Sequence, residues 1–227
     1  MIKRTILFIF TIACMSNLIV AQNNSKMINI KTLKQTDIGN PAIVGKVAIT
    51  DKSIDVNAGG ADIWGVHDEF HFSYKIIKGD FDLSVQVLGL SEANKYTKAG
   101  IMARADLSDN SQHVYYQIFP DNSARNKNNG GCEFQYRLEK AGEMKAIYPD
   151  VKTVGHQFDV TFPNTWIRLK RHGNVFESYM SSDNISWKLY STHEQVLPNE
   201  LFVGLAVTSH NTKDITTARF ESFQILK

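Results

Sequence analysis

Five side chains with ligand-binding chemistry fall within one stretch of ten residues: Asp62, Trp64, His67, Asp68 and His71. An indole face can stack on a pyranose ring, and carboxylates accept hydrogen bonds from hydroxyls or ligate Ca²⁺. One interpretation of the cluster is therefore a saccharide or metal site, with Asp62 and Asp68 as candidate calcium ligands. The favoured interpretation is structural, because Trp64 can close one end of a fold while the two aspartates bind backbone N–H groups of a turn.

Further binding candidates come from the strand patterns. His210 and Asn211 end a segment with small residues on one face, which leaves space above a sheet, although His210 can equally cap a loop. Arg104 and Arg137 alternate with apolar residues, so their guanidinium groups either bind sugar hydroxyls or form ion pairs on a solvated face. Of two adjacent tyrosines one ring must face away from the core. We include Tyr116 as the candidate for stacking, although the alternation does not say which ring it is.

Patterns of established catalytic sites are missing from the sequence, so we assign no catalytic residue. Glycoside hydrolysis needs two carboxyls about 5–10 Å apart, and the pair Asp80 and Asp82 follows a turn glycine and is typical of a soluble edge strand. Gly-x-Ser-x-Gly, His-Glu-x-x-His and Cys-x-x-Cys do not occur. Non-catalytic saccharide binding is the favoured hypothesis. A hydrolase or lyase with an unrecognised acid pair, and an interaction domain without a small ligand, are the alternatives.

The N-terminal residues have the pattern of an export signal. Lys3 and Arg4 precede an apolar run over 6–15, and Ala21 suits the last position before signal-peptidase cleavage. The run is too short and interrupted for a membrane span, which needs about 20 apolar residues. We expect a secreted, periplasmic or cell-surface protein cleaved after Ala21, with lipidation at Cys14 as the alternative.

Composition limits the partners of the exported part. Removing 21 residues from the chain of 227 leaves 206, and it removes two basic residues, so the formal charge falls from +2 to zero. This balance does not favour nucleic acid or anionic membranes, and we expect a poly- or oligosaccharide partner. Cys132 then stands alone, which excludes an internal disulfide. No cofactor is predicted apart from the calcium named above, and the sequence leaves the oligomeric state open.

Period-two alternation of apolar and polar residues extends over most of residues 40–227 and is the signal of half-buried strands. The main segments are 43–49, 70–76, 81–88, 99–105, 113–119, 132–138, 166–171, 175–180, 187–192, 201–208 and 218–226. Turn-forming residues separate them, which predicts an all-β fold: a two-sheet antiparallel jelly-roll sandwich in one domain. Residues 22–39 are polar and weakly patterned. We expect them to form a lead-in that tethers the domain or adds an edge strand.

Four motifs carry a family resemblance: GADIWG at 60–65, KAGIMAR at 98–104, WIRLKRHGN at 166–174 and VGLAVTSHN at 203–211. In order and spacing they resemble the concanavalin A-like lectin/glucanase superfamily, and within it the "regulation of enolase"-type module of bacterial secreted proteins. The resemblance covers about 43–226. It implies a jelly-roll sandwich, and a role beside carbohydrate-active enzymes implies binding more than catalysis. The sequence departs from the family pattern at 121–131 and 139–162, where loops can reshape a site.

Overall fold

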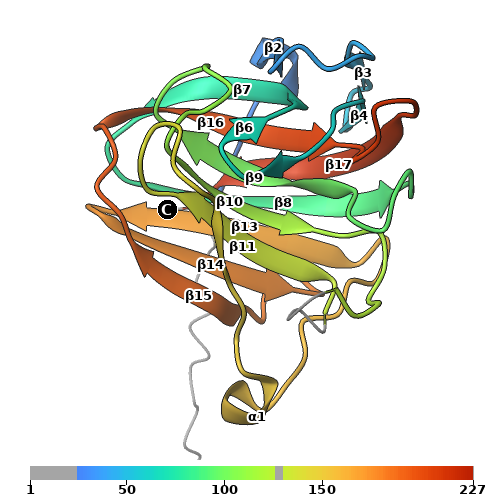
Figure 1. Cartoon of the computed structure of the whole chain (residues 1–227). Helices are drawn as coiled ribbons and strands as arrows, with labels where there is room; N and C mark the ends of the chain where they lie inside the picture. Colours follow the sequence, from blue (N-terminus) through green and yellow to red (C-terminus); the bar gives the residue numbers. More distant parts are fainter. Residues whose placement is uncertain (1–24, 126–129, 227) are drawn as a thin grey trace, which may run out of the picture.

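The computed structural model describes residues 25–125 and 130–226. The predicted signal peptide, its cleavage after Ala21 and the alternative lipidation at Cys14 all lie outside these residues. Within the described part, no helix has the length and apolar character needed to cross a membrane. The chain forms two large antiparallel sheets that face one another, and a small hairpin (Figure 1).

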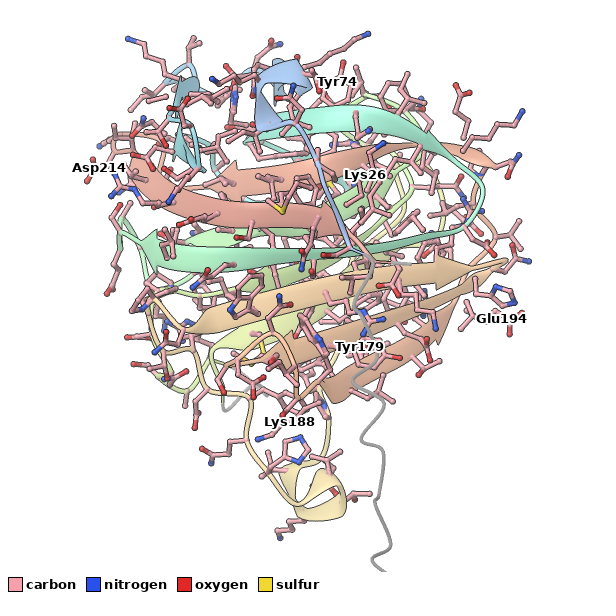
Figure 2. The ribbon with its side chains drawn as sticks, turned by 180° about the vertical axis from the view of Figure 1, so that it is seen from behind. Lys26, Tyr74, Tyr179, Lys188, Glu194 and Asp214 are labelled. Atoms are coloured by element: carbon pink, nitrogen blue, oxygen red, sulfur yellow. The ribbon has the colours of Figure 1, made fainter. Side chains whose placement is uncertain are left out.

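One large sheet has eight strands, and its outer face is seen in Figure 2. Along the sheet the order is β15 (Lys188–Glu194), β14 (Val175–Ser181), β13 (Thr165–His172), β8 (Phe81–Leu90), β17 (Thr216–Ile225), β4 (Ser53–Ala58) and β3 (Lys46–Ile49), with β1 (Lys26–Met27) paired to β17. Tyr179 of β14 lies on the outer face of this sheet, away from the second sheet (Figure 2).

The other large sheet has seven strands and carries the candidate site. Its order is β12 (Lys145–Ile147), β11 (Cys132–Arg137), β10 (His113–Ile118), β9 (Lys98–Arg104), β16 (Glu200–Thr208), β7 (Phe70–Lys78) and β2 (Lys34–Ile38). Strand β2 comes from the predicted lead-in segment and pairs with β7 at the sheet edge. The β5–β6 hairpin (Ile63–Trp64 and His67–Asp68) forms the remaining pair of strands.

The hydrophobic core lies between the two large sheets. In β13, Ile167 and Leu169 are fully buried while Trp166 and Arg168 are partly exposed, as alternation along a strand requires. Each fully buried aliphatic side chain contributes about 1.5–3 kcal/mol relative to its exposed state, so the core holds the two sheets together. The all-β sandwich predicted from the alternation is confirmed.

The outer face of the seven-stranded sheet is also covered, which alternation alone does not indicate. Every residue of β9 and β10 is buried. A second apolar cluster forms there, in which Ile63 of the hairpin and Leu107 pack with Phe70, Met102 and Tyr115. Loops thus close most of this face, and ligand access is confined to the part they leave open.

Two short helices connect strands without covering either sheet. The 3₁₀ helix η1 (Ile30–Thr32) precedes β2, and α1 (Val151–Val154) projects below the sheets in Figure 1. Asp150 caps α1 by accepting a hydrogen bond from the Lys152 N–H, and Gly155 ends it in the left-handed conformation. Helix α1 lies in the segment 139–162, where the sequence departs from the family pattern.

Candidate functional site

A cleft of about 230 Å³ opens on the outer face of the seven-stranded sheet, and we call it the Trp64 cleft. It is lined by Asp62, Trp64, Tyr96, Lys98, Phe119, Glu133, Gln135, Tyr148 and His210. Lys98, Glu133 and Gln135 come from strands β9 and β11, and the other residues come from the hairpin and from loops at strand ends. The lining combines aromatic rings with two carboxyls and one ammonium.

Asp62 is held as a charged group on one wall of the cleft. Its Oδ1 accepts hydrogen bonds from Lys98 Nζ at 2.6 Å and from the Ile63 N–H at 2.7 Å. Its Oδ2 lies 3.2 Å from His210 Nε2. Burial alone would raise the pKa of Asp62, but Lys98 and His210 outweigh it and lower the pKa to about 2.

Local backbone geometry brings these partners together. Gly60 has φ +115°, and a Cβ at this position would lie 2.1 Å from the Glu69 carbonyl oxygen, so only glycine allows the hairpin to begin here. His210 is itself left-handed, with φ +53°, a conformation in which a histidine costs backbone energy. This conformation follows the end of β16 and leaves the His210 ring beside Asp62 and 5.4 Å from the Tyr96 ring centroid.

The cleft floor is a pair of buried polar side chains on β11. Glu133 and Gln135 share the outward face and are 5% and 1% exposed. The Gln135 amide Nε2 donates a hydrogen bond to the Glu133 carboxylate. Gln135 Oε1 has no hydrogen-bond partner among the described residues, and neither amide atom of Gln117, opposite Glu133 on β10, has one. Buried polar atoms of this kind require water or a ligand.

Glu133 and Tyr148 hold a proton more tightly than free side chains do. Burial raises the pKa of Glu133, although Lys98 and the hydrogen bond from Gln135 act in the opposite direction. Burial and the neighbouring Glu133 carboxylate raise the pKa of Tyr148 well above its usual range. Tyr148 lines the cleft together with Glu133, and each side chain acts on the pKa of the other. The cleft therefore contains one carboxyl that is readily ionised, Asp62, and one that is not, Glu133.

Aromatic rings form the remaining walls. Trp64 is 40% exposed, and Lys98 Nζ lies 5.6 Å from its ring centroid. Phe119 is buried, and its ring centroid lies 6.4 Å from that of Tyr96. An exposed indole above a polar floor offers a flat apolar surface to one side of a bound ring.

A buried ionic cluster fixes the hairpin that carries Asp62 and Trp64. Arg137 donates to both Asp68 oxygens at 2.7 Å, and a further Arg137 bond reaches the Gly65 carbonyl oxygen at 3.0 Å. Arg104 and His113 each lie 3.7 Å from Asp68. Burial lowers the pKa of Arg104 to about 10 and that of His113 to about 4. Arg104 therefore stays charged, and His113 is neutral at pH 7.

The structure brings three of the nine sequence candidates to the cleft: Asp62, Trp64 and His210. Asp68, Arg104 and Arg137 are fully buried beneath the hairpin, so their guanidinium and carboxylate groups bind protein groups there. Asp68 is thus encircled by cations where we expected a calcium ligand. Among the described residues, no three His, Cys, Asp or Glu side chains lie together as a metal site would require.

The other three candidates lie away from the cleft lining. His67 is half exposed beside Asp109, at 3.3 Å. The Asn211 backbone N–H donates to the Gly60 carbonyl oxygen at 3.0 Å, and its side-chain amide donates to the Ala93 carbonyl oxygen, so it ties loops together. Tyr116 lies in the core between the sheets, where its hydroxyl donates to Cys132 Sγ.

Sequence reasoning missed most of the lining: Tyr96, Lys98, Phe119, Glu133, Gln135 and Tyr148. One signal was available, because Glu133, Gln135 and Arg137 form a polar row at alternate positions of an otherwise apolar strand. Two of these three residues form the floor of the cleft, and the third anchors the hairpin above it.

Comparisons with known proteins identify the fold. No family model matches the sequence, and no curated protein matches it. A solved structure described as a functionally unknown protein from Saccharomyces cerevisiae aligns with TM-score 0.65 and 15% identity over 86% of this chain and 96% of that chain. The carbohydrate-binding module CBM66 from Bacillus subtilis aligns with TM-score 0.53 and 16% identity over 85% and 95%.

A third similar structure is the exoplasmic/lumenal domain of VIP36 in its Ca²⁺/Man3GlcNAc-bound form, with TM-score 0.51 and 8% identity over 86% of this chain and 83% of that chain. At sequence identities this low, the similarity shows the fold alone and not the function. The narrower resemblance to the "regulation of enolase"-type module stays a prediction. The chain has the two-sheet sandwich of the concanavalin A-like type.

Proposed function

We propose that this protein is an exported, non-catalytic saccharide-binding module that holds its ligand in the Trp64 cleft. The observation that carries the proposal is the combination of an exposed indole with a buried polar floor. Trp64 offers a ring face, and Gln135 offers a carbonyl oxygen that no described residue satisfies. A sugar has both an apolar face and a rim of hydroxyls, so one ring of a glycan meets both requirements.

Two further points support this proposal. The hairpin that bears Trp64 is fixed by the buried Asp68–Arg137 pair, so the cleft is formed before a ligand arrives and binding orders few side chains. Two of the structures with a similar fold are described as a carbohydrate-binding module and as bound to Man3GlcNAc. Export itself rests on the predicted signal peptide, and N-terminal sequencing of the secreted protein tests it.

The test is a glycan array followed by titration calorimetry of the best ligand with two variants. We expect Trp64→Ala to weaken binding about thirtyfold, the loss typical of an aromatic residue at the centre of a binding site. Val66→Ala is the matched control: it is exposed on the same hairpin and does not line the cleft. An array without any ligand, or equal affinities for wild type and Trp64→Ala, contradicts the proposal and favours an interaction domain.

A second candidate function is glycoside hydrolysis, favoured by one observation. Asp62 and Glu133 line the same cleft, and their surroundings shift the two pKa values in opposite directions. In this scheme Glu133 donates its proton to the glycosidic oxygen as the C–O bond breaks. A water oxygen attacks the anomeric carbon and gives its proton to Asp62. If the wild type releases reducing ends from a glycan and Glu133→Gln does not, the function is catalysis and not binding alone.

A further inference from the structure

The Trp64 cleft contains two carboxyls, and its two basic side chains, Lys98 and His210, both lie against one of them, Asp62. Asp62 and Glu133 provide two carboxyls, and Lys98 provides the single ammonium. Lys98 is committed to the Asp62 side, since its Nζ donates to Asp62 Oδ1 at 2.6 Å and to the Ile63 carbonyl oxygen at 3.0 Å. Glu133 forms no ion pair with any described residue, and it is only 5% exposed. A buried carboxylate without a cation is costly, so Glu133 requires either a proton or a positive partner.

The neighbours of Glu133 also favour a ligand that donates hydrogen bonds. Gln135 Nε2 already donates to Glu133, which leaves the Gln135 carbonyl oxygen as the free acceptor in the floor. Tyr148 lines the cleft beside these two residues. Among the residues that line the cleft, the atoms that face the part of the ligand reaching the floor are therefore acceptors. A carboxylate, sulfate or phosphate at this position would meet like charge and unpaired acceptors.

We propose that the saccharide bound in the Trp64 cleft carries a protonated amine, as a deacetylated hexosamine does, with its ammonium placed against Glu133 and Gln135. This inference rests on the proposed binding function and names the ligand class of the same site. An ammonium has three N–H donors, and it pairs with the Glu133 carboxylate and the Gln135 carbonyl oxygen through charge-assisted bonds.

The aromatic walls are compatible with a cation. Lys98 Nζ lies 5.6 Å from the Trp64 ring centroid, and Lys95 Nζ lies 4.9 Å from that of Tyr96. The negative faces of aromatic rings attract cations, and the attraction is stronger where water is excluded. The same rings provide the apolar surface on which the pyranose packs. One aminosugar ring thus accounts for the indole, the acceptors of the floor and the buried Glu133 carboxyl together.

The test compares three β-1,4-linked hexasaccharides that differ only at carbon 2 of each ring. Cellohexaose has a hydroxyl there, the chitin hexamer an acetamido group and the chitosan hexamer an ammonium. At pH about 6 and low salt we expect the chitosan hexamer to bind about tenfold more tightly than the other two, as a charge-assisted bond predicts. Added salt should reduce the difference.

Variants test whether the Glu133 carboxyl causes the preference for the chitosan hexamer. Glu133→Gln keeps the shape of the side chain and removes its charge, so its affinities for the chitosan hexamer and cellohexaose should become equal. Glu143→Gln is the matched control, since Glu143 is exposed and outside the cleft. If Glu133→Gln does not fold, calorimetry of the wild type in buffers of different ionisation enthalpy replaces it. An ammonium beside Glu133 favours the ionised carboxyl, so binding between pH about 4.5 and 6 should release a proton.

The outcomes separate this inference from the proposed function. Equal or tighter binding of cellohexaose or the chitin hexamer by the wild type overturns the amine preference. So does binding of none of the three hexasaccharides, a preference that Glu133→Gln retains, or binding without proton release. Saccharide binding as such survives each of these results if another array glycan binds and Trp64→Ala loses it. Saccharide binding and the amine preference are contradicted together only if no glycan binds in a way that depends on Trp64.

Discussion

Lys98 and Asp62 are joined by a 2.6 Å salt bridge that connects the first residue of β9 to the residue before the hairpin. Lys98 is almost fully buried, whereas a quarter of the Asp62 side chain is exposed to the cleft. The ammonium also lies 5.6 Å from the centroid of the Trp64 ring. Lys98 therefore contacts both the Asp62 carboxylate and the Trp64 ring, and it helps to hold both in place.

Lys98→Met should remove this support. The methionine retains most of the apolar volume but leaves Asp62 with His210 and the Ile63 N–H as partners. We expect the free energy of unfolding to fall by about 2 kcal/mol, below the value for a fully buried pair because Asp62 reaches solvent. Urea unfolding measures the loss. The double variant Lys98→Met/Asp62→Asn should recover part of it, and a double variant no more stable than Lys98→Met would contradict this explanation.

Arg137→Lys should be more damaging than its chemical similarity indicates. The Arg137 guanidinium donates to both Asp68 oxygens and to the Gly65 carbonyl oxygen, and an ammonium cannot reproduce this planar geometry. We expect a loss of about 3 kcal/mol of stability together with weaker glycan binding. The control is Lys140→Met, which breaks an exposed ion pair with Asp106 and should cost less than about 1 kcal/mol. Equal effects of the two variants would contradict a structural role for the buried cluster.

His113 should make stability depend on pH below neutrality. Burial lowers its pKa from 6.5 to about 4 in the folded protein. Between these values the unfolded chain binds a proton that the folded protein does not, so stability falls as the pH drops from 6.5 to about 4. The difference in pKa corresponds to about 3 kcal/mol. His113→Gln should flatten the curve of melting temperature against pH in this window. His172→Gln removes an exposed ion pair with Asp80, at a side chain that is 84% exposed, and should change the curve much less.

His210→Asn should separate binding from folding. Asparagine tolerates the left-handed backbone that His210 adopts at φ +53°, so we expect stability to change by less than about 0.5 kcal/mol. The variant removes the ring that lies 3.2 Å from Asp62 and 5.4 Å from the Tyr96 ring centroid. Titration of the glycan ligand should therefore show weaker binding by a protein that melts normally. A large drop in melting temperature would mean that the His210 ring supports the fold.

The sequence predicts the sandwich well because strand alternation is a local property. Ile167 and Leu169 face the core and Arg168 faces outward, as their spacing requires. The same logic could not decide between Tyr115 and Tyr116. Alternation says that they lie on opposite faces, and only the packing of the second sheet makes Tyr116 the core residue.

The cleft could be predicted only in part. Alternation predicts that the outer face of the seven-stranded sheet is open to solvent, but a loop covers much of this face. Arg104 and Arg137 have the spacing of solvent-facing residues, yet the hairpin and loop 106–111 bury them with Asp68. Trp64 and Asp62 were found because a glycine-bounded turn with an indole is unusual in itself. Glu133 was missed because its raised pKa depends on burial, which no local pattern indicates.

The residues that line the cleft come from distant parts of the sequence, so no short fragment of the protein contains the whole binding site. The folded sheet brings together residues from separate stretches of the chain: Asp62, Lys98, Glu133, Tyr148 and His210. No synthetic peptide copied from one stretch carries the recognition surface, and grafting one loop onto another scaffold transfers a fragment of it. An antibody against the intact cleft should accordingly fail to stain the denatured polypeptide on a blot.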